Sequence, residues 1–125
     1  MHVRSIALAV VLVGISALAL TPPLHAQETP DELRALAEQG DARAQVALGF
    51  RYALGVGVPQ DYVEAHMWFN LAAAQSSAED RDRRVKARND VAKRMTAEQI
   101  AEAQRRAREW QPTPEPRSHE DGDSF

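Results

Sequence analysis

The fold follows from residues 42–75, which read ARAQVALGFRYALGVGVPQDYVEAHMWFNLAAAQ. Asp41 and Asp61 stand directly before two apolar periodic segments, where their carboxylates can cap the first turn of a helix. Gly55 stops the first segment, because glycine readily takes the backbone conformation that ends a helix. No segment alternates with period two, so strands are not expected. The stretch predicts two helices, 42–54 and 62–75, joined by a loop over 55–60.

Both predicted helices are apolar on two sides. The first carries one stripe at Ala44, Leu48 and Tyr52 and a second at Val46, Phe50 and Ala53. The second carries Tyr62, Ala65, Trp68, Phe69, Ala72 and Ala73 on one face and Met67, Leu71 and Ala74 on the other. A lone amphipathic helix has one apolar face, so these helices must be packed on both sides. The sequence therefore predicts an all-α fold, a short α/α solenoid of antiparallel helix hairpins.

One glycine stands inside the first of these helices. Gly49 costs about 1 kcal/mol there relative to alanine. We expect this cost to be offset by close approach of the paired helix, through the small alanines of that helix.

Helix signals continue on both sides of this stretch. Thr29 to Glu32 is a capping box that opens a helix ending at Gly40. Ser76 or Ser77 can cap a helix to about Met95, and a second capping box at Thr96 opens another to Trp110. The expected organisation is a signal peptide, an N-terminal helix, a central hairpin, a C-terminal helical pair and an acidic proline-rich tail predicted to be disordered. These units occupy residues 1–26, 27–41, 42–75, 76–110 and 111–125.

The first 26 residues have the order of a secretory signal peptide. Arg4 precedes an uncharged run from Ser5 to Leu20, and a small residue, Ala26, offers a cleavage point. The run is short for a membrane anchor, which is the alternative. The sequence thus predicts a periplasmic or secreted protein that is cut after Ala26 and meets the membrane only transiently, through this peptide.

Composition excludes several classes of site. The 125 residues contain no cysteine, so disulfides, thiolate nucleophiles and cysteine-ligated metals are excluded. The net charge of −3 gives no global basic balance to suggest a nucleic-acid partner.

The central hairpin resembles the Sel-1-like repeat, a tetratricopeptide-related helical hairpin. Residues 32–39 resemble the second helix of a truncated preceding repeat, which makes 27–41 a half-repeat. Residues 95–110 resemble the helix that often follows such repeats in exported bacterial proteins. The match over 42–75 rests on thirteen positions at fixed spacing: Ala44, Leu48, Gly49, Tyr52, Gly55, Gly57, Val58, Asp61, Tyr62, Ala65, Trp68, Ala72 and Ala73.

This resemblance implies a scaffold for protein contacts, without a catalytic site. The expected surface is the stripe of Val46, Phe50 and Ala53, with Arg51 beside it in a position where the family usually has an apolar residue. An exposed aromatic residue next to an arginine is typical of a binding hot spot. The alternative is that Phe50 packs against the N-terminal helix.

A run of bases between positions 81 and 94 is a second candidate surface. Arg83, Lys86, Lys93 and Arg94 lie opposite a thin apolar stripe of Ala78, Val85 and Ala92. They could dock an acidic protein, an anionic lipid or an acidic polysaccharide. The alternative is a solvated helix with ion pairs four residues apart, such as Asp82–Lys86 and Asp90–Arg94.

No residue pattern indicates catalysis, a cofactor or a metal. The Gly55–Gly57 loop lacks the lysine of a phosphate-binding loop and is read as a tight turn. His66 is expected to be half-buried and hydrogen-bonded, and the run from His119 to Asp123 to be solvated. The sequence favours a non-enzymatic interaction module or adaptor of the bacterial envelope, with a protein partner. The alternatives are a homo-oligomeric structural protein and a small envelope hydrolase.

Overall fold

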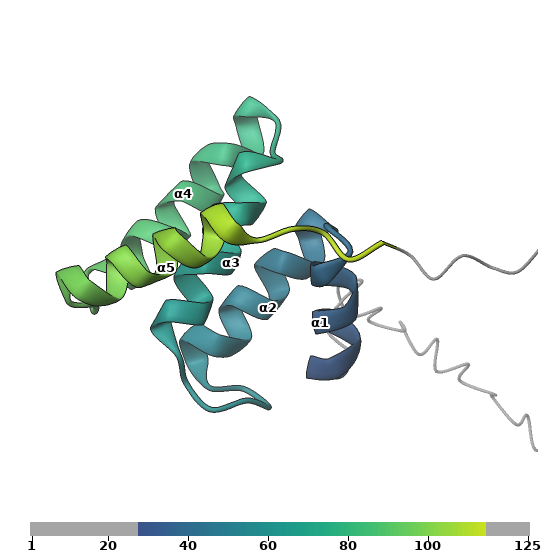
Figure 1. The fold of residues 1–125 in the computed structure, drawn as a ribbon, viewed down its shortest axis with the longest axis horizontal. Helices are drawn as coiled ribbons and strands as arrows, with labels where there is room; N and C mark the ends of the chain where they lie inside the picture. Colours follow the sequence, from purple (N-terminus) through teal and green to yellow (C-terminus); the bar gives the residue numbers. More distant parts are fainter. Residues whose placement is uncertain (1–27, 115–125) are drawn as a thin grey trace, which may run out of the picture.

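Five helices make up residues 28–114, the part of the chain that the computed structural model describes (Figure 1). The segment predicted to be a signal peptide and most of the predicted acidic tail lie outside these residues. Within them there is no strand, and the predicted all-α class is confirmed. The helices are α1 (Pro30–Glu38), α2 (Ala42–Leu54), α3 (Tyr62–Ala74), α4 (Ala78–Ala92) and α5 (Ala97–Glu109).

The predicted caps start these helices, with one exception. Four side chains accept a hydrogen bond from the backbone N–H three residues later: Thr29, Asp41, Asp61 and Thr96. Both capping boxes are formed, so the first turns of α1 and α5 are each closed in both directions. Ser77 is the N-cap residue of α4, but its hydroxyl makes no cap hydrogen bond.

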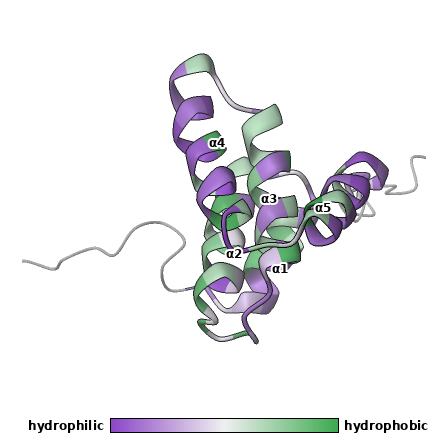
Figure 2. Cartoon of the chain, turned by 90° about the vertical axis from the view of Figure 1, so that its left-hand side faces the viewer, coloured by the Kyte–Doolittle hydropathy of each residue, from purple (hydrophilic) through white to green (hydrophobic). Residues whose placement is uncertain are grey.

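Each of the first four helices of the described residues packs on the next, as a short solenoid requires. α2 lies between α1 and α3, and α4 packs on α3. α5 packs on α3 as well and crosses in front of it in Figure 1. The α2–α3 hairpin is thus covered by other helices on both sides, in agreement with its two apolar faces. Figure 2 shows the contrast in hydropathy between this hairpin and the hydrophilic α4.

The core is divided into two clusters, one on each side of the hairpin. The first joins α1, α2 and α3, with Trp110 packed against it, and contains Leu33, Ala37, Ala44, Leu48, Met67 and Trp68. The second joins α3 and α4 and contains Ala65, Phe69 and Val91. Trp68 and Phe69 therefore belong to different clusters, and the expected single face that contained both is wrong. Adjacent helical residues point about 100° apart, so each can reach its own side of α3.

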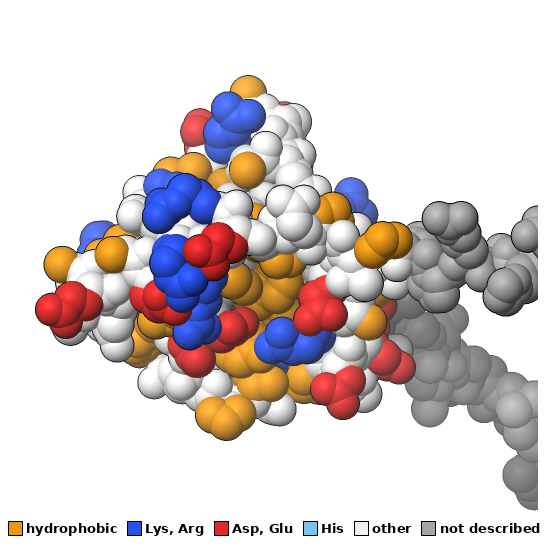
Figure 3. Space-filling model, viewed as in Figure 1, with side chains coloured by type: hydrophobic (Ala, Val, Ile, Leu, Met, Phe, Trp, Pro, Cys, Tyr) orange, Lys and Arg blue, Asp and Glu red, His pale blue; other side chains and the backbone are white. Residues whose placement is uncertain are grey.

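One side of the hairpin is closed by the C-terminal part of the chain. The rings of Trp68 and Trp110 meet edge to face with their centroids 6.3 Å apart. Glu64 accepts hydrogen bonds from Trp68 Nε1 at 3.1 Å and from Arg106 at 3.2 Å. Beyond α5, the N–H of Thr113 donates to the Glu38 carbonyl at 2.7 Å. Figure 3 shows acidic and basic side chains interspersed around apolar ones on this face.

Candidate interaction surface

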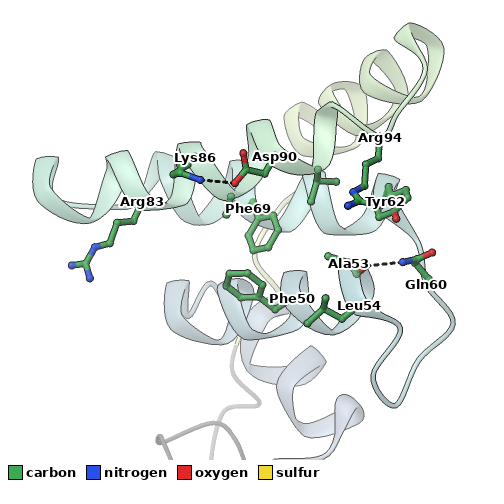
Figure 4. A pocket seen from close by; sticks show the side chains of 12 residues that line it. Phe50, Ala53, Leu54, Gln60, Tyr62, Phe69, Arg83, Lys86, Asp90 and Arg94 are labelled. Atoms are coloured by element: carbon green, nitrogen blue, oxygen red, sulfur yellow. Dashed lines mark hydrogen bonds and ion pairs between the residues drawn. The ribbon is translucent and has the colours of Figure 1, made fainter.

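The opposite side of the hairpin is an open groove between α2 and α4. One hollow in this groove has a volume of about 450 Å³. α2 supplies one wall and α4 the other, while α3 lies behind them (Figure 4). A second, smaller hollow continues the groove toward Arg43, in the first turn of α2. The side chains of α2 and α4 therefore do not fill the space between these two helices, and an elongated groove remains.

The floor of the groove is a pair of phenylalanine rings. Phe50 and Phe69 meet at 71° with their centroids 4.9 Å apart. The ring of Phe69 is buried, whereas Phe50 remains 47% exposed. In Figure 4 both rings lie between α2 and α4. Phe50 is thus held by an aromatic contact from α3 and still presents an apolar face to the groove.

Gly49 explains how Phe69 reaches this position. A Cβ atom at Gly49 would lie 2.8 Å from Phe69 Cε1 and 2.9 Å from its Cδ1, closer than carbon atoms can approach. The expected close approach is confirmed, but the group that approaches is an aromatic ring and not the small alanines of the paired helix. The missing side chain of Gly49 makes room for the ring beneath Phe50.

The predicted apolar stripe of α2 faces this groove. Val46 and Ala53 pack against the second core cluster and also line the groove, together with Phe50. Arg51 does not share this surface. Its side chain is half-buried and donates from Nη2 to the Glu28 carbonyl at 2.9 Å, so it fastens the segment before α1.

The wall supplied by α4 is basic. Arg83, Lys86 and Arg94 line the groove, whereas Lys93 is not among its lining residues. Asp90 accepts from Lys86 at 2.7 Å and from Lys93 at 3.4 Å, and these bonds hold the pKa of Asp90 below its ordinary value. Arg94 has no ion pair within residues 28–114 and in Figure 4 points toward Tyr62.

The predicted ion pairs and apolar stripe of α4 are wrong in detail. Lys86 pairs with Asp90 and not with Asp82. Carboxylates stand four residues before and four residues after Lys86, so helical spacing alone does not choose between them. The buried residue is Val91, with Ala87 beside it, and not the stripe of Ala78, Val85 and Ala92.

Two arginines from the basic run attach α4 to α3. Arg84 donates to the Ala72 carbonyl at 3.1 Å. Arg88 donates to Asn70 Oδ1 at 2.9 Å. The apolar stems of such residues can cover core surface while their charged ends reach polar partners. This explains how the hydrophilic helix α4 packs on α3.

The thirteen repeat positions have structural roles. Ala44, Leu48, Gly49, Ala65, Trp68, Ala72 and Ala73 are buried, and Tyr52, Val58, Asp61 and Tyr62 are half-buried. Gly55 and Gly57 are exposed and have φ values of 68° and 74°, which favour glycine. The loop is therefore the tight turn that the sequence predicts.

One buried polar residue, Gln45, and one half-buried carboxylate, Glu64, were not foreseen. Gln45 is fully buried, donates to the Ala37 carbonyl at 3.1 Å and accepts from Gln75 at 3.0 Å. Glu64 accepts hydrogen bonds from Trp68 and Arg106, and Arg34 Nη2 lies 3.8 Å from Glu64 Oε2. Ala37, Arg34 and Arg106 belong to other helices, so helical spacing gives no signal for their contacts. Trp68 lies four residues after Glu64 on α3, a spacing that the sequence does show.

His66 differs from the expectation. It is 3% exposed, and its Nδ1 atom has no hydrogen-bond partner among residues 28–114. Burial, with the charge of Arg88 as a smaller cause, lowers the pKa of His66 below its ordinary value. Within the described residues, no three His, Asp or Glu side chains are grouped to hold a metal ion.

The buried imidazole makes stability depend on mildly acidic pH. At a pH above the ordinary pKa of histidine, His66 is neutral in both the folded and the unfolded chain. As the pH falls below that value, the unfolded chain binds a proton at His66 before the folded chain does. Stability is therefore expected to fall as pH drops from neutral toward the lowered pKa of His66. Thermal melts at a series of pH values should show a weaker dependence in His66→Gln. An unchanged slope in that variant would show that His66 is not the responsible group.

Comparison with known proteins agrees with this geometry. The Sel1 repeat family matches residues 42–77, which comprise α2, the glycine loop, α3 and the start of the turn to α4. The chain is 40% identical over 65 residues to the secretory immunoglobulin A-binding protein EsiB of Escherichia coli O6:H1. That match covers 52% of this chain and 13% of EsiB. No solved structure matches the chain. The resemblance seen in the sequence is thus confirmed, and this chain carries a Sel1 repeat formed by the α2–α3 hairpin.

Proposed function

We propose that this chain is a non-enzymatic adaptor of the bacterial envelope that binds another protein through the α2–α4 groove. Sel1 repeats are protein-interaction modules in general. The name of EsiB describes a protein that binds secretory immunoglobulin A, which is also protein recognition. The envelope location rests on the signal-like first 26 residues. Within residues 28–114, none of the helices has the length and apolar character needed to cross a membrane.

The observation that carries the proposal is the half-exposed ring of Phe50, which packs on the buried ring of Phe69. An aromatic side chain that is already ordered loses little conformational entropy on binding, and such residues dominate binding energy. Two other large hydrophobic residues are exposed on the described chain. Leu54 lines the same groove, and Val56 lies in the loop after α2 and does not line it. The groove therefore combines an apolar anchor point with a concave shape and charged walls.

Replacing Phe50 by alanine should weaken partner binding at least about tenfold, equivalent to about 1.4 kcal/mol. The melting temperature should change little, because half of the ring is already exposed to solvent. The measurement is crosslinked capture of the exported chain from its own envelope, followed by titration of the captured protein against each variant.

Val56→Ala is the matched control, since Val56 is 51% exposed but does not line the groove. Equal affinity in the Phe50 and Val56 variants would exclude the groove as the binding surface. Light scattering over a range of concentrations tests the alternative of self-assembly. Concentration-dependent dimers that Phe50→Ala abolishes would identify the partner as a second copy.

A further inference from the structure

The groove carries an excess of positive charge that the described chain as a whole does not have. Residues 28–114 contain fourteen acidic and thirteen basic residues, a nearly balanced set. The two hollows of the groove are lined by five basic and two acidic side chains. The bases are Arg43, Arg83, Arg84, Lys86 and Arg94, and the acids are Asp80 and Asp90. An occupant that suits this groove carries negative charge and an apolar group for the Phe50 floor.

One segment of the chain itself has this composition. Residues 115–125 read EPRSHEDGDSF and contain four acids, a single base and one aromatic residue, Phe125. The acids are Glu115, Glu120, Asp121 and Asp123. The segment thus offers negative charge to the walls and a phenyl ring to the floor.

The structure holds the residues just before this segment near one end of the groove. Thr113 is bonded to the Glu38 carbonyl, and Pro112 and Trp110 lie against Gly40, with 3.9 Å to the position of a Cβ there. Glu38 is only five residues before Arg43, which lines the groove. The attachment point therefore lies at the corner between α1 and α2, where the groove begins.

The segment is long enough to reach the floor. Eleven residues span at most about 36–40 Å when extended. The whole of α2 is about 20 Å long, and Phe50 is in its third turn. The segment can therefore pass the corner and run along the groove beyond Phe50.

We propose that residues 115–125 dock in the α2–α4 groove of the same molecule, with their carboxylates on Arg83, Lys86 and Arg94 and the ring of Phe125 on Phe50. A short tether gives an effective concentration in the millimolar range, so a weak intrinsic affinity is enough for substantial occupancy. A partner protein must then displace this segment to bind. The inference rests on the proposed function, because it concerns the same groove.

A spin label tests this docking directly. The chain has no cysteine, so Ser124→Cys provides a single attachment point for a nitroxide. In the isotopically labelled exported chain, amides of Val46, Phe50 and Ala53 should lose at least about half their signal at millimolar effective concentration. Amides of α5, on the other side of the hairpin, should keep theirs. High salt should restore the groove signals, because it screens the exposed charges.

Charge variants give the matched comparison. Arg83→Glu with Lys86→Glu should abolish the loss of signal in the groove. Arg105→Glu with Arg108→Glu makes the same change of charge on exposed positions of α5 and should leave the loss intact. The docking would be overturned if both double variants changed the loss of signal equally. It would also be overturned if the groove amides lost no more signal than the amides of α5.

A mixing experiment separates this docking from contact with a second copy. Isotopically labelled chain without a spin label is mixed with unlabelled chain that carries it. The groove amides in this mixture should keep their signal. If they lose as much signal as in the doubly labelled chain, docking within one molecule is overturned. The proposed function is judged independently, by the loss of partner binding in Phe50→Ala.

Discussion

Replacing Trp68 by alanine should lower the free energy of unfolding by about 3–5 kcal/mol, the range for deletion of a large buried aromatic side chain. Trp68 is 1% exposed and belongs to the cluster where α1, α2 and α3 meet. Its ring also contacts Trp110, and its Nε1 donates to Glu64. Alanine would leave a cavity beneath α5 and remove a hydrogen bond from a half-buried carboxylate. Urea unfolding followed by far-ultraviolet circular dichroism measures the effect.

Trp68→Phe is the control for this prediction. It keeps an aromatic ring in the cluster but removes the N–H that reaches Glu64, so its loss of stability should be clearly smaller. It also remains measurable if the alanine variant is unfolded without denaturant. A Trp68→Ala chain that unfolds at the same urea concentration as the original would contradict the central place of this residue in the core.

Replacing Gly49 by valine should lower the free energy of unfolding by about 1–3 kcal/mol, the usual cost of overpacking a core. The ring of Phe69 occupies the space that the new side chain needs, and that ring is held between Phe50 and the second cluster. The better helix propensity of valine recovers only a few tenths of this cost. Displacing Phe69 should also move the floor of the groove, so amide resonances of Phe50 and Ala53 should shift.

Ala101→Val is the control for valine as such, because Ala101 is exposed on α5. It should cost only a few tenths of a kcal/mol, the loss of helix propensity alone. If Gly49→Val costs no more than this control, then Phe69 can move away cheaply and Gly49 is not required for its position.

Local signals were sufficient to predict most of the fold. The caps at Asp41 and Asp61 and the positive-φ glycine at Gly55 act within one helical turn, so they can be recognised in a single sequence. The two apolar stripes of α2 likewise predict two-sided packing, because both stripes must be removed from water. These features depend on residues that are neighbours along the chain.

Features that depend on distant residues were missed. α5 was expected from its capping box, but its place across α3 depends on the meeting of Trp110 with Trp68, which lie 42 positions apart. The partners of Lys86 could not be chosen from the sequence, since carboxylates stand one turn away in both directions. Arg51 was placed beside Phe50 because they are adjacent in sequence, yet a helix turns adjacent side chains by about 100°.

The bond between Thr113 and Glu38 joins the first helix to the segment that follows the last one. In a linear array of repeats, each unit contacts only its neighbours, so melting can begin at an end and spread inward. Here the first and last parts of the described chain protect each other, and neither can fray without exposing the other. The small domain should therefore open as one cooperative unit, with amide hydrogen exchange in α1 and α5 governed by the same event.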